Sequence, residues 1–281
     1  MIIKRKLTRM RIRSFITISI IAGSLLGFTP DNDTSKEQTG TIRKLKQLSF
    51  KKGEFLEYDV SYGFFDAAKA TLEIAHKTKE INGRNTMHII GKSKSSGAVR
   101  WFFKVDDRYE TFLDEEAILP WKFVRHVREG GYSLDRSIDF DQFENKATVF
   151  QKDTKNYTVK PNTQDLLSAF YYARTLDLQD AKIGQEFVIN TFFDREMYPL
   201  KIKFLGKDKI KTKLGKFKCL KFRPMVEKGR VFKEEEDMTL WISDDANKVP
   251  IRLKADLLVG AIKMDLIAHK NLSGKLNLID D

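Results

Sequence analysis

Apolar and polar residues alternate with a period of two along most of the chain from residue 50 onward. The clearest segments lie at 56–62, 70–74, 101–106, 238–242, 251–257 and 262–266. Because successive side chains of a strand point to opposite faces, this pattern indicates sheets with one buried and one solvated face. Sheets of that kind are usually antiparallel, since parallel sheets are covered on both faces. The pattern therefore predicts a mainly β protein.

Turn signals separate the alternating segments, among them Asn82-Gly83, Gly130-Gly131 and the polar run at 244–247. Strands joined by short turns tend to lie next to each other in a sheet. We therefore expect a curved antiparallel sheet or a barrel-like meander.

The segment at 163–177 departs from the alternation and predicts one amphipathic helix, because its apolar residues follow helical spacing. Asn162 or Thr163 is suited to cap this helix, and Asp165 falls in its first turn. We interpret its aromatic stripe as core packing. The central helix divides the predicted β structure into two lobes.

The first 28 residues have the pattern of a signal peptide. Residues 1–13 are basic, and the 14 residues at 15–28 carry no charge, which is too short to cross a bilayer comfortably. We expect residues 1–28 to be a signal peptide, 29–48 a flexible polar leader and 49–281 a single β-rich domain. The predicted location is the periplasm, with an uncleaved N-terminal anchor as the alternative. No later apolar run approaches the ~18 residues of a membrane span.

The formal net charge of +12 by itself would suggest a nucleic-acid-binding protein, but the positions of the charged residues do not. Six of the basic residues lie in the first 28 positions, and the remainder has 45 basic against 39 acidic residues. Both signs are interspersed, as on an ordinary mixed-charge surface. We therefore expect no nucleic-acid partner, and composition does not define the oligomeric state.

Familiar catalytic and metal-binding motifs are absent from the sequence. The four histidines are far apart, and no His-Glu-x-x-His, Cys-x-x-Cys or Gly-x-Ser-x-Gly motif occurs. The single cysteine, Cys219, lies in an alternating segment and is interpreted as an apolar filler of a strand. No catalytic residue, metal or cofactor is predicted.

Three motifs resemble the bacterial family called domain of unknown function 3108. The first is Gly53-Glu54-x-Leu56-x-Tyr58-x-Val60-x-Tyr62-Gly63, and the second is the helix-forming run at 165–174. The third comprises 214–219 and 241–252, where Lys248 stands in place of an expected arginine. The resemblance covers about residues 50–270. It implies an exported protein with a curved antiparallel sheet, and no established activity.

A curved sheet rich in Phe, Tyr and Trp favours an apolar concavity for a lipid-like or glycan ligand. This non-enzymatic binding function is the main hypothesis, with Trp101, Tyr171 and Trp241 as candidate ligand contacts. Two alternatives stay open. The protein is a structural or assembly partner in the cell envelope, or it is a polysaccharide hydrolase that uses dispersed carboxylates.

Overall fold

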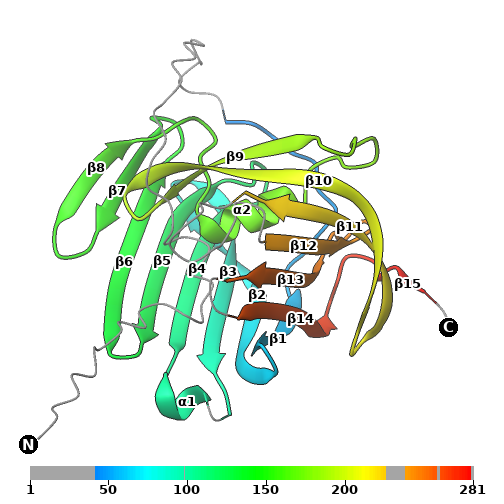
Figure 1. Cartoon of the computed structure of the whole chain (residues 1–281). Helices are drawn as coiled ribbons and strands as arrows, with labels where there is room; N and C mark the ends of the chain where they lie inside the picture. Colours follow the sequence, from blue (N-terminus) through cyan, green and yellow to red (C-terminus); the bar gives the residue numbers. More distant parts are fainter. Residues whose placement is uncertain (1–41, 98, 226–237, 258–259, 280–281) are drawn as a thin grey trace, which may run out of the picture.

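The computed structural model describes residues 42–97, 99–225, 238–257 and 260–279 (Figure 1). The predicted signal peptide and most of the predicted leader lie outside the described residues. The described part contains fifteen strands and two helices.

The first half of the chain forms eight strands and a short helix. They are β1 (Phe55–Tyr62), β2 (Phe65–Ile81), β3 (Arg84–Ser95), α1 (Val99–Phe102), β4 (Asp106–Asp114), β5 (Pro120–Glu129), β6 (Tyr132–Asp141), β7 (Lys146–Phe150) and β8 (Thr154–Thr158). The central helix α2 (Leu166–Ala173) follows. The second half consists of β9 (Glu186–Phe193), β10 (Glu196–Thr212), β11 (Gly215–Pro224), β12 (Met238–Ser243), β13 (Pro250–Asp256), β14 (Ala261–Lys270) and β15 (Leu278–Ile279).

All the strands belong to one antiparallel sheet, which is strongly curved. Each half of the chain is a meander, and the two halves join where β1 pairs with β14. The strand order runs from β8 through β1 and β14 to β9, and β15 is attached to β11. Because β8 and β9 end this order, the sheet of the described residues does not close into a barrel. The predicted fold class, a curved antiparallel meander in two lobes with a central helix, is confirmed.

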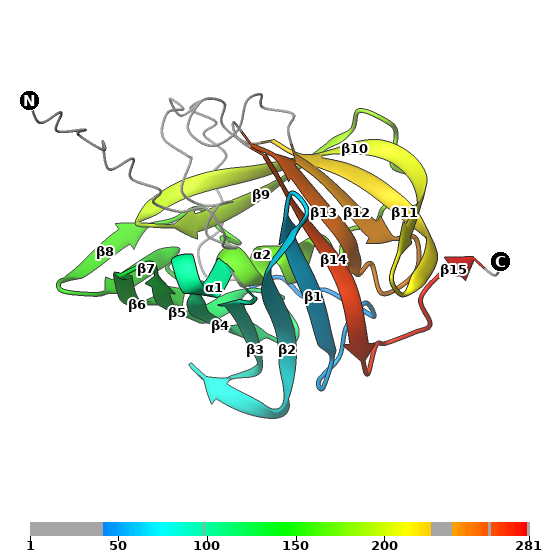
Figure 2. The same cartoon turned by 60° about the horizontal axis from the view of Figure 1, so that its bottom comes forward.

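Ion pairs bridge the gap that the open sheet leaves between its two halves. Asp194, in the turn between β9 and β10, accepts hydrogen bonds from Arg125 Nη1 at 2.7 Å and Arg136 Nη1 at 2.5 Å. The next residue, Arg195, donates to Asp153 Oδ1 at 2.6 Å in the β7–β8 turn. These ion pairs, together with the backbone bridge between Gln164 and Thr191 of β9, hold the long β9–β10 hairpin against the first half of the sheet. Figure 2 shows this hairpin reaching across to β8.

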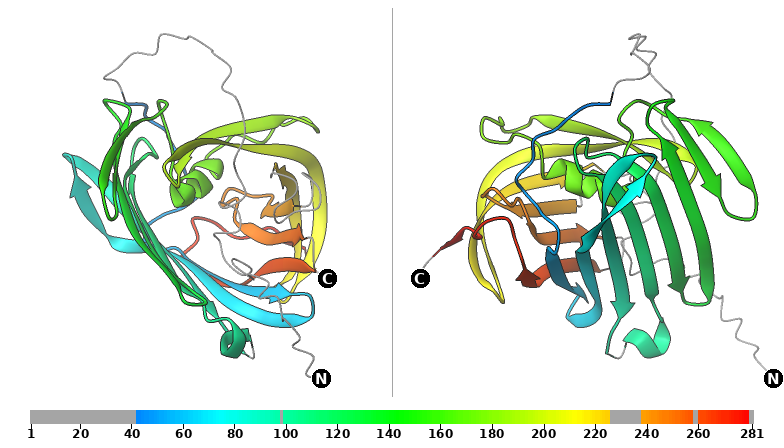
Figure 3. Two further views of the ribbon diagram at one scale, coloured as in Figure 1. Left: turned by 60° about the vertical axis from the view of Figure 1, so that its left-hand side comes forward. Right: turned by 180° about the vertical axis from the view of Figure 1, so that it is seen from behind.

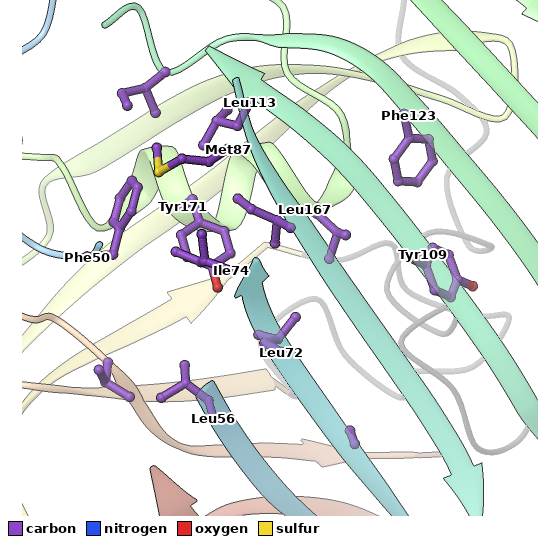
Figure 4. Close-up of a cluster of buried hydrophobic side chains, with 14 of the residues drawn as sticks. Phe50, Leu56, Leu72, Ile74, Met87, Tyr109, Leu113, Phe123, Leu167 and Tyr171 are labelled. Atoms are coloured by element: carbon purple, nitrogen blue, oxygen red, sulfur yellow. The ribbon is translucent and has the colours of Figure 1, made fainter. Parts of the chain in front are cut away.

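Helix α2 lies inside the curve of the sheet, between the two halves (Figure 3). Its Tyr171 is fully buried and packs edge-to-face on Phe50, with ring centroids 4.9 Å apart. Leu167 points toward the first half of the sheet (Figure 4). A Cβ at Gly91 would lie 3.3 Å from Leu167 Cδ2, so glycine at that position lets the helix approach the sheet closely.

Two local predictions were wrong. The helix is shorter than 163–177 and begins after Asp165, which is itself the cap, because its carboxylate accepts hydrogen bonds from Leu167 N and Ser168 N. Asn162 instead occupies a turn with φ 58°. The alternation at 101–106 predicted a strand through Trp101, but a helical turn, α1, connects β3 to β4 there. Its aromatic residues point to solvent, so no buried face selects a strand.

Candidate functional site

An apolar cavity lies between helix α2 and the concave face of the sheet, and its volume is about 250 Å³. Leu166, Phe170 and Ala173 of α2 form one wall. The opposite wall comes from β1, β2 and from β9 to β14, and includes Leu72, Ile189, Ile202, Leu240, Leu253 and Met264. The volume is slightly below the roughly 300–1,000 Å³ of typical ligand pockets. It therefore suits a small or single-chain apolar molecule.

Small residues on the inner face of β2 and β3 contribute to this space. Ala68 and Ala70 on β2 and Ser93 on β3 line the cavity, and Ala70 lies directly opposite Ser93 in the ladder. Bulkier side chains at these positions would fill part of the volume. The sequence contains these small residues at alternate positions of the predicted strands. It does not show which residues lie opposite them, so the lining of the cavity could not be predicted from it.

Few polar side chains reach the cavity wall. Apart from Ser93 and the buried Tyr58, the polar residues that line it are Arg174 and Lys248. Lys248 is half-buried and its Nζ donates to the carbonyl oxygen of Leu176. Burial lowers the pKa of Lys248. An ammonium group has three donors, so Lys248 retains hydrogen-bonding capacity for a further acceptor.

Arg174 is engaged in a buried ion pair at the end of α2. Its Nη1 and Nη2 donate to Glu54 Oε1 at 2.5 Å and Oε2 at 2.8 Å, and both residues are at most 2 % exposed. Its remaining bonds go to backbone carbonyls, from Nε to Asn247 at 3.0 Å and from Nη2 to Ser49 at 2.9 Å. Burial and the neighbouring Glu54 carboxylate raise the pKa of Tyr171. Arg174 therefore joins three distant segments, and we assign it a structural role.

The three aromatic residues predicted as ligand contacts do not come together. Trp101 lies on α1 and is 90 % exposed, whereas Tyr171 is fully buried behind the cavity wall. Trp241 is half-buried on the face of β12 opposite to Leu240. None of the three lines the cavity. A role for them in ligand binding stays a prediction, and the lining residues themselves were not identified from the sequence.

Trp241→Ala is expected to lower the free energy of unfolding by about 2 kcal/mol, below the ~3–5 kcal/mol typical of fully buried tryptophans. The indole packs at the edge of the core, and its Nε1 donates to Asp208 Oδ2 at 2.9 Å. Urea unfolding measures the loss, and Trp241→Phe separates the contribution of the ring from that of the hydrogen bond. A loss above about 4 kcal/mol would show that the indole is more deeply buried in solution.

Two buried carboxylates lie on the concave face of the first half. Asp107 is 2 % exposed and Glu129 is 7 % exposed. Burial raises the pKa of Asp107 to about 7 and Glu129 adds to the shift, whereas the Arg128 N–H, 2.8 Å from Oδ1, opposes it. A carboxyl group that titrates near neutral pH is suited to general acid catalysis. If the protein were a polysaccharide hydrolase, Asp107 would be the candidate for its general acid. The hydrolase alternative stays a prediction.

The described residues give little basis for other chemistry. Among them, no group of three or more His, Cys, Asp or Glu side chains is arranged to hold a metal ion. Cys219 is fully buried, and burial raises the pKa of its thiol to about 12, which makes it unreactive at neutral pH. No described helix is long and apolar enough to cross a membrane.

A family model called "Protein of unknown function (DUF3108)" matches residues 57–267. The chain belongs to this family. The family predicted from the sequence is therefore confirmed, and no curated protein is significantly similar in sequence. Among solved structures, a β-barrel-like protein of domain of unknown function DUF1849 from Brucella abortus is 10 % identical, with a TM-score of 0.48 over 81 % of this chain and 99 % of its own. The hypothetical protein CT021 from Chlamydia trachomatis is 8 % identical, with a TM-score of 0.35 over 83 % and 95 %.

The three segments that carry the family resemblance meet around the cavity. Glu54 precedes β1, Arg174 ends the helical motif, and Asn247 lies in the turn before β13. The side chain of Asn247 also bonds to the C-terminal segment, where its Nδ2 donates to the carbonyl oxygens of Gly274 and Lys275. The motifs of this DUF3108 protein therefore fix the helix that covers the cavity, and each of them also contributes lining residues, among them Val60, Leu166 and Pro250.

Proposed function

We propose that this protein is an exported cell-envelope protein that binds a lipid-like ligand in the cavity beneath α2. The observation that carries the proposal is the nearly continuous apolar lining of that cavity. Filling an apolar cavity with a hydrocarbon chain removes apolar surface from water on both partners. The signal-peptide pattern of residues 1–28 supports export, and the periplasm is the compartment that we propose.

The lining favours a lipid-like ligand over a glycan. A glycan carries many hydroxyl groups, each of which costs free energy to bury without a hydrogen-bond partner. The cavity wall offers few such partners, whereas a hydrocarbon chain requires none. Lys248 would meet a polar or anionic end group of the ligand, because its ammonium lies at the wall with donors to spare.

Mass spectrometry of an organic extract of the purified protein would identify a co-purifying ligand. A matched pair of variants on β12 then locates it. Leu240→Trp places an indole in the cavity, whereas Thr239→Trp places the same group on the opposite face of the strand. We expect Leu240→Trp to weaken binding of a fluorescent fatty acid by about tenfold or more, equivalent to at least ~1.4 kcal/mol. Thr239→Trp should bind as the wild type does.

Two results would count against the proposal. If the extract contains no lipid and the fluorescent fatty acid does not bind, the cavity does not act as a lipid site. The structural or assembly alternative would then be favoured. If both Trp variants bind the probe equally well, the probe occupies another surface. Circular dichroism and melting of each variant would verify that loss of binding is not loss of folding.

A further inference from the structure

Four aromatic side chains are exposed at one end of the sheet. Phe64 and Phe65 lie at the β1–β2 turn, and Phe65 is 70 % exposed while Phe64 is fully exposed. Trp101 and Phe102, on α1, are 90 % and 89 % exposed. Large contiguous apolar patches are rare on soluble monomers and usually mark an interaction site. We refer to these four residues as the aromatic patch.

The two halves of the aromatic patch lie side by side, although about 36 residues separate them in the chain. The Ser96 N–H donates to the carbonyl oxygen of Ala67 at 2.9 Å, which ties the segment before α1 to β2. Val99 of α1 packs against Ala67 and Ala68. Both α1 and the β1–β2 turn are found at this end of the molecule (Figure 1).

The protein holds α1 in place rather than leaving its aromatic residues on a loose loop. The Phe103 ring lies over the β5–β6 turn so closely that a Cβ at Gly130 would be 2.3 Å from its Cε2 atom. The Gly130 N–H also donates to the carbonyl oxygen of Lys104 at 2.9 Å. Trp101 and Phe102 are therefore presented to solvent from a segment that is fixed on both sides.

Basic residues accompany the aromatic patch. Arg100 and Lys104 are exposed beside Trp101 and Phe102. The acidic Asp106 is paired with Lys94 at 3.6 Å, and Asp66 is a further exposed acid near the patch. Trp and Phe combined with Arg and Lys are the residues that proteins place at the boundary of an anionic bilayer. The aromatic rings enter the interface while the cations meet the headgroups.

We propose that the aromatic patch docks this protein on the surface of a bilayer that contains anionic lipids. The patch continues toward the cavity, because Val60 of β1 and Ala68 of β2 line the cavity and lie next to the β1–β2 turn. Docking here would bring the cavity to the membrane. Transfer of a lipid between the membrane and the cavity would rest on the proposed function of lipid binding. Docking on the membrane does not depend on that function.

Vesicle binding tests the proposal, with the protein recovered from the periplasmic fraction. Vesicles of phosphatidylethanolamine with a minority of phosphatidylglycerol are compared with vesicles of phosphatidylcholine alone. We expect Trp101→Ser with Phe102→Ser to weaken binding by about tenfold or more. Arg100→Gln and Lys104→Gln should each weaken binding only to anionic vesicles, about fivefold, from ~1 kcal/mol per basic residue. Ile183→Ser, which removes an exposed apolar side chain outside the patch, is the matched control.

Tryptophan fluorescence reports directly on whether Trp101 contacts the lipid. Vesicle binding through the apolar N-terminal residues would not produce this signal. The chain has three tryptophans, and Trp121 is only 1 % exposed. Brominated lipids should quench the wild-type emission, and Trp101→Phe should bind equally well with that quenching removed. The proposal is overturned if Trp101 is not quenched in vesicle-bound protein, or if the double Ser variant binds as tightly as the wild type. A dimer in sedimentation that the double Ser variant loses, without vesicle binding, would reassign the patch to a second copy of the chain.

Discussion

Glu54→Gln is expected to lower the free energy of unfolding by about 3–5 kcal/mol, because it leaves Arg174 buried without a compensating charge. The guanidinium is 2 % exposed, and Glu54 is the acidic partner of both its Nη atoms. The loss should be visible as a lower midpoint of urea unfolding at neutral pH. The pair joins the chain before β1 to the end of α2, so the variant should also loosen the helix that covers the cavity.

Asp256→Asn is the matched control for this effect. Asp256 pairs with Lys254 at 3.0 Å, and both side chains are more than 40 % exposed. Exposed pairs contribute about 0–1 kcal/mol. Replacing both members of the buried pair, with Glu54→Leu and Arg174→Met, should recover part of the lost stability, because no uncompensated charge remains. A loss below about 1 kcal/mol for Glu54→Gln would contradict the structural role of the pair.

The sequence predicts the strands well where one face is buried. Leu56 and Tyr58 of β1 and Leu72 and Ile74 of β2 are buried at alternate positions, as their spacing indicates. The same reasoning fails at Trp101, because Trp101 and its neighbour Phe102 are both exposed although the apolar residues of this segment alternate with polar ones from Phe103 onward. Alternation of apolar and polar residues indicates a strand with one buried face only where another part of the protein packs on that face. The sequence does not show where such packing occurs.

The site depends on contacts that no local pattern contains. The cavity needs the pairing of β1 with β14, which brings Val60 opposite Met264, about 204 positions away. The pair of Glu54 and Arg174 likewise spans 120 positions. The family motifs contain both residues but do not show that they meet. The small residues at 68, 70 and 93 were the feature of the sequence that pointed to the position of a cavity. They indicate a cavity only when the residues of the opposite wall are known.

Asp165→Ala is expected to cost about 2–4 kcal/mol of unfolding free energy. Asp165 is fully buried and caps α2, with Oδ1 accepting from Leu167 N at 2.8 Å and Ser168 N at 2.9 Å. Its Oδ2 accepts from the Thr111 hydroxyl at 2.5 Å. Loss of a cap costs about 0.5–2 kcal/mol, and a buried donor left without a partner costs about 1–3 kcal/mol. Urea unfolding would measure the sum, and fatty-acid binding would report whether the cavity wall formed by α2 is preserved.

Asp165→Asn provides the control, because asparagine caps helices about as well as aspartate. Burial raises the pKa of Asp165 to about 6, above its ordinary value of 3.8. The folded protein therefore holds this proton to a higher pH than the unfolded chain does. The stability contributed by protonated Asp165 is present at low pH and is lost as the pH rises from about 4 to about 6. Relative to Asp165→Asn, the wild type should lose stability across this window and then stay level. If the stability difference between the two proteins does not change with pH, the pKa of Asp165 is not raised in the folded protein. Its carboxylate is then ionised across this window and stabilised by its three hydrogen bonds.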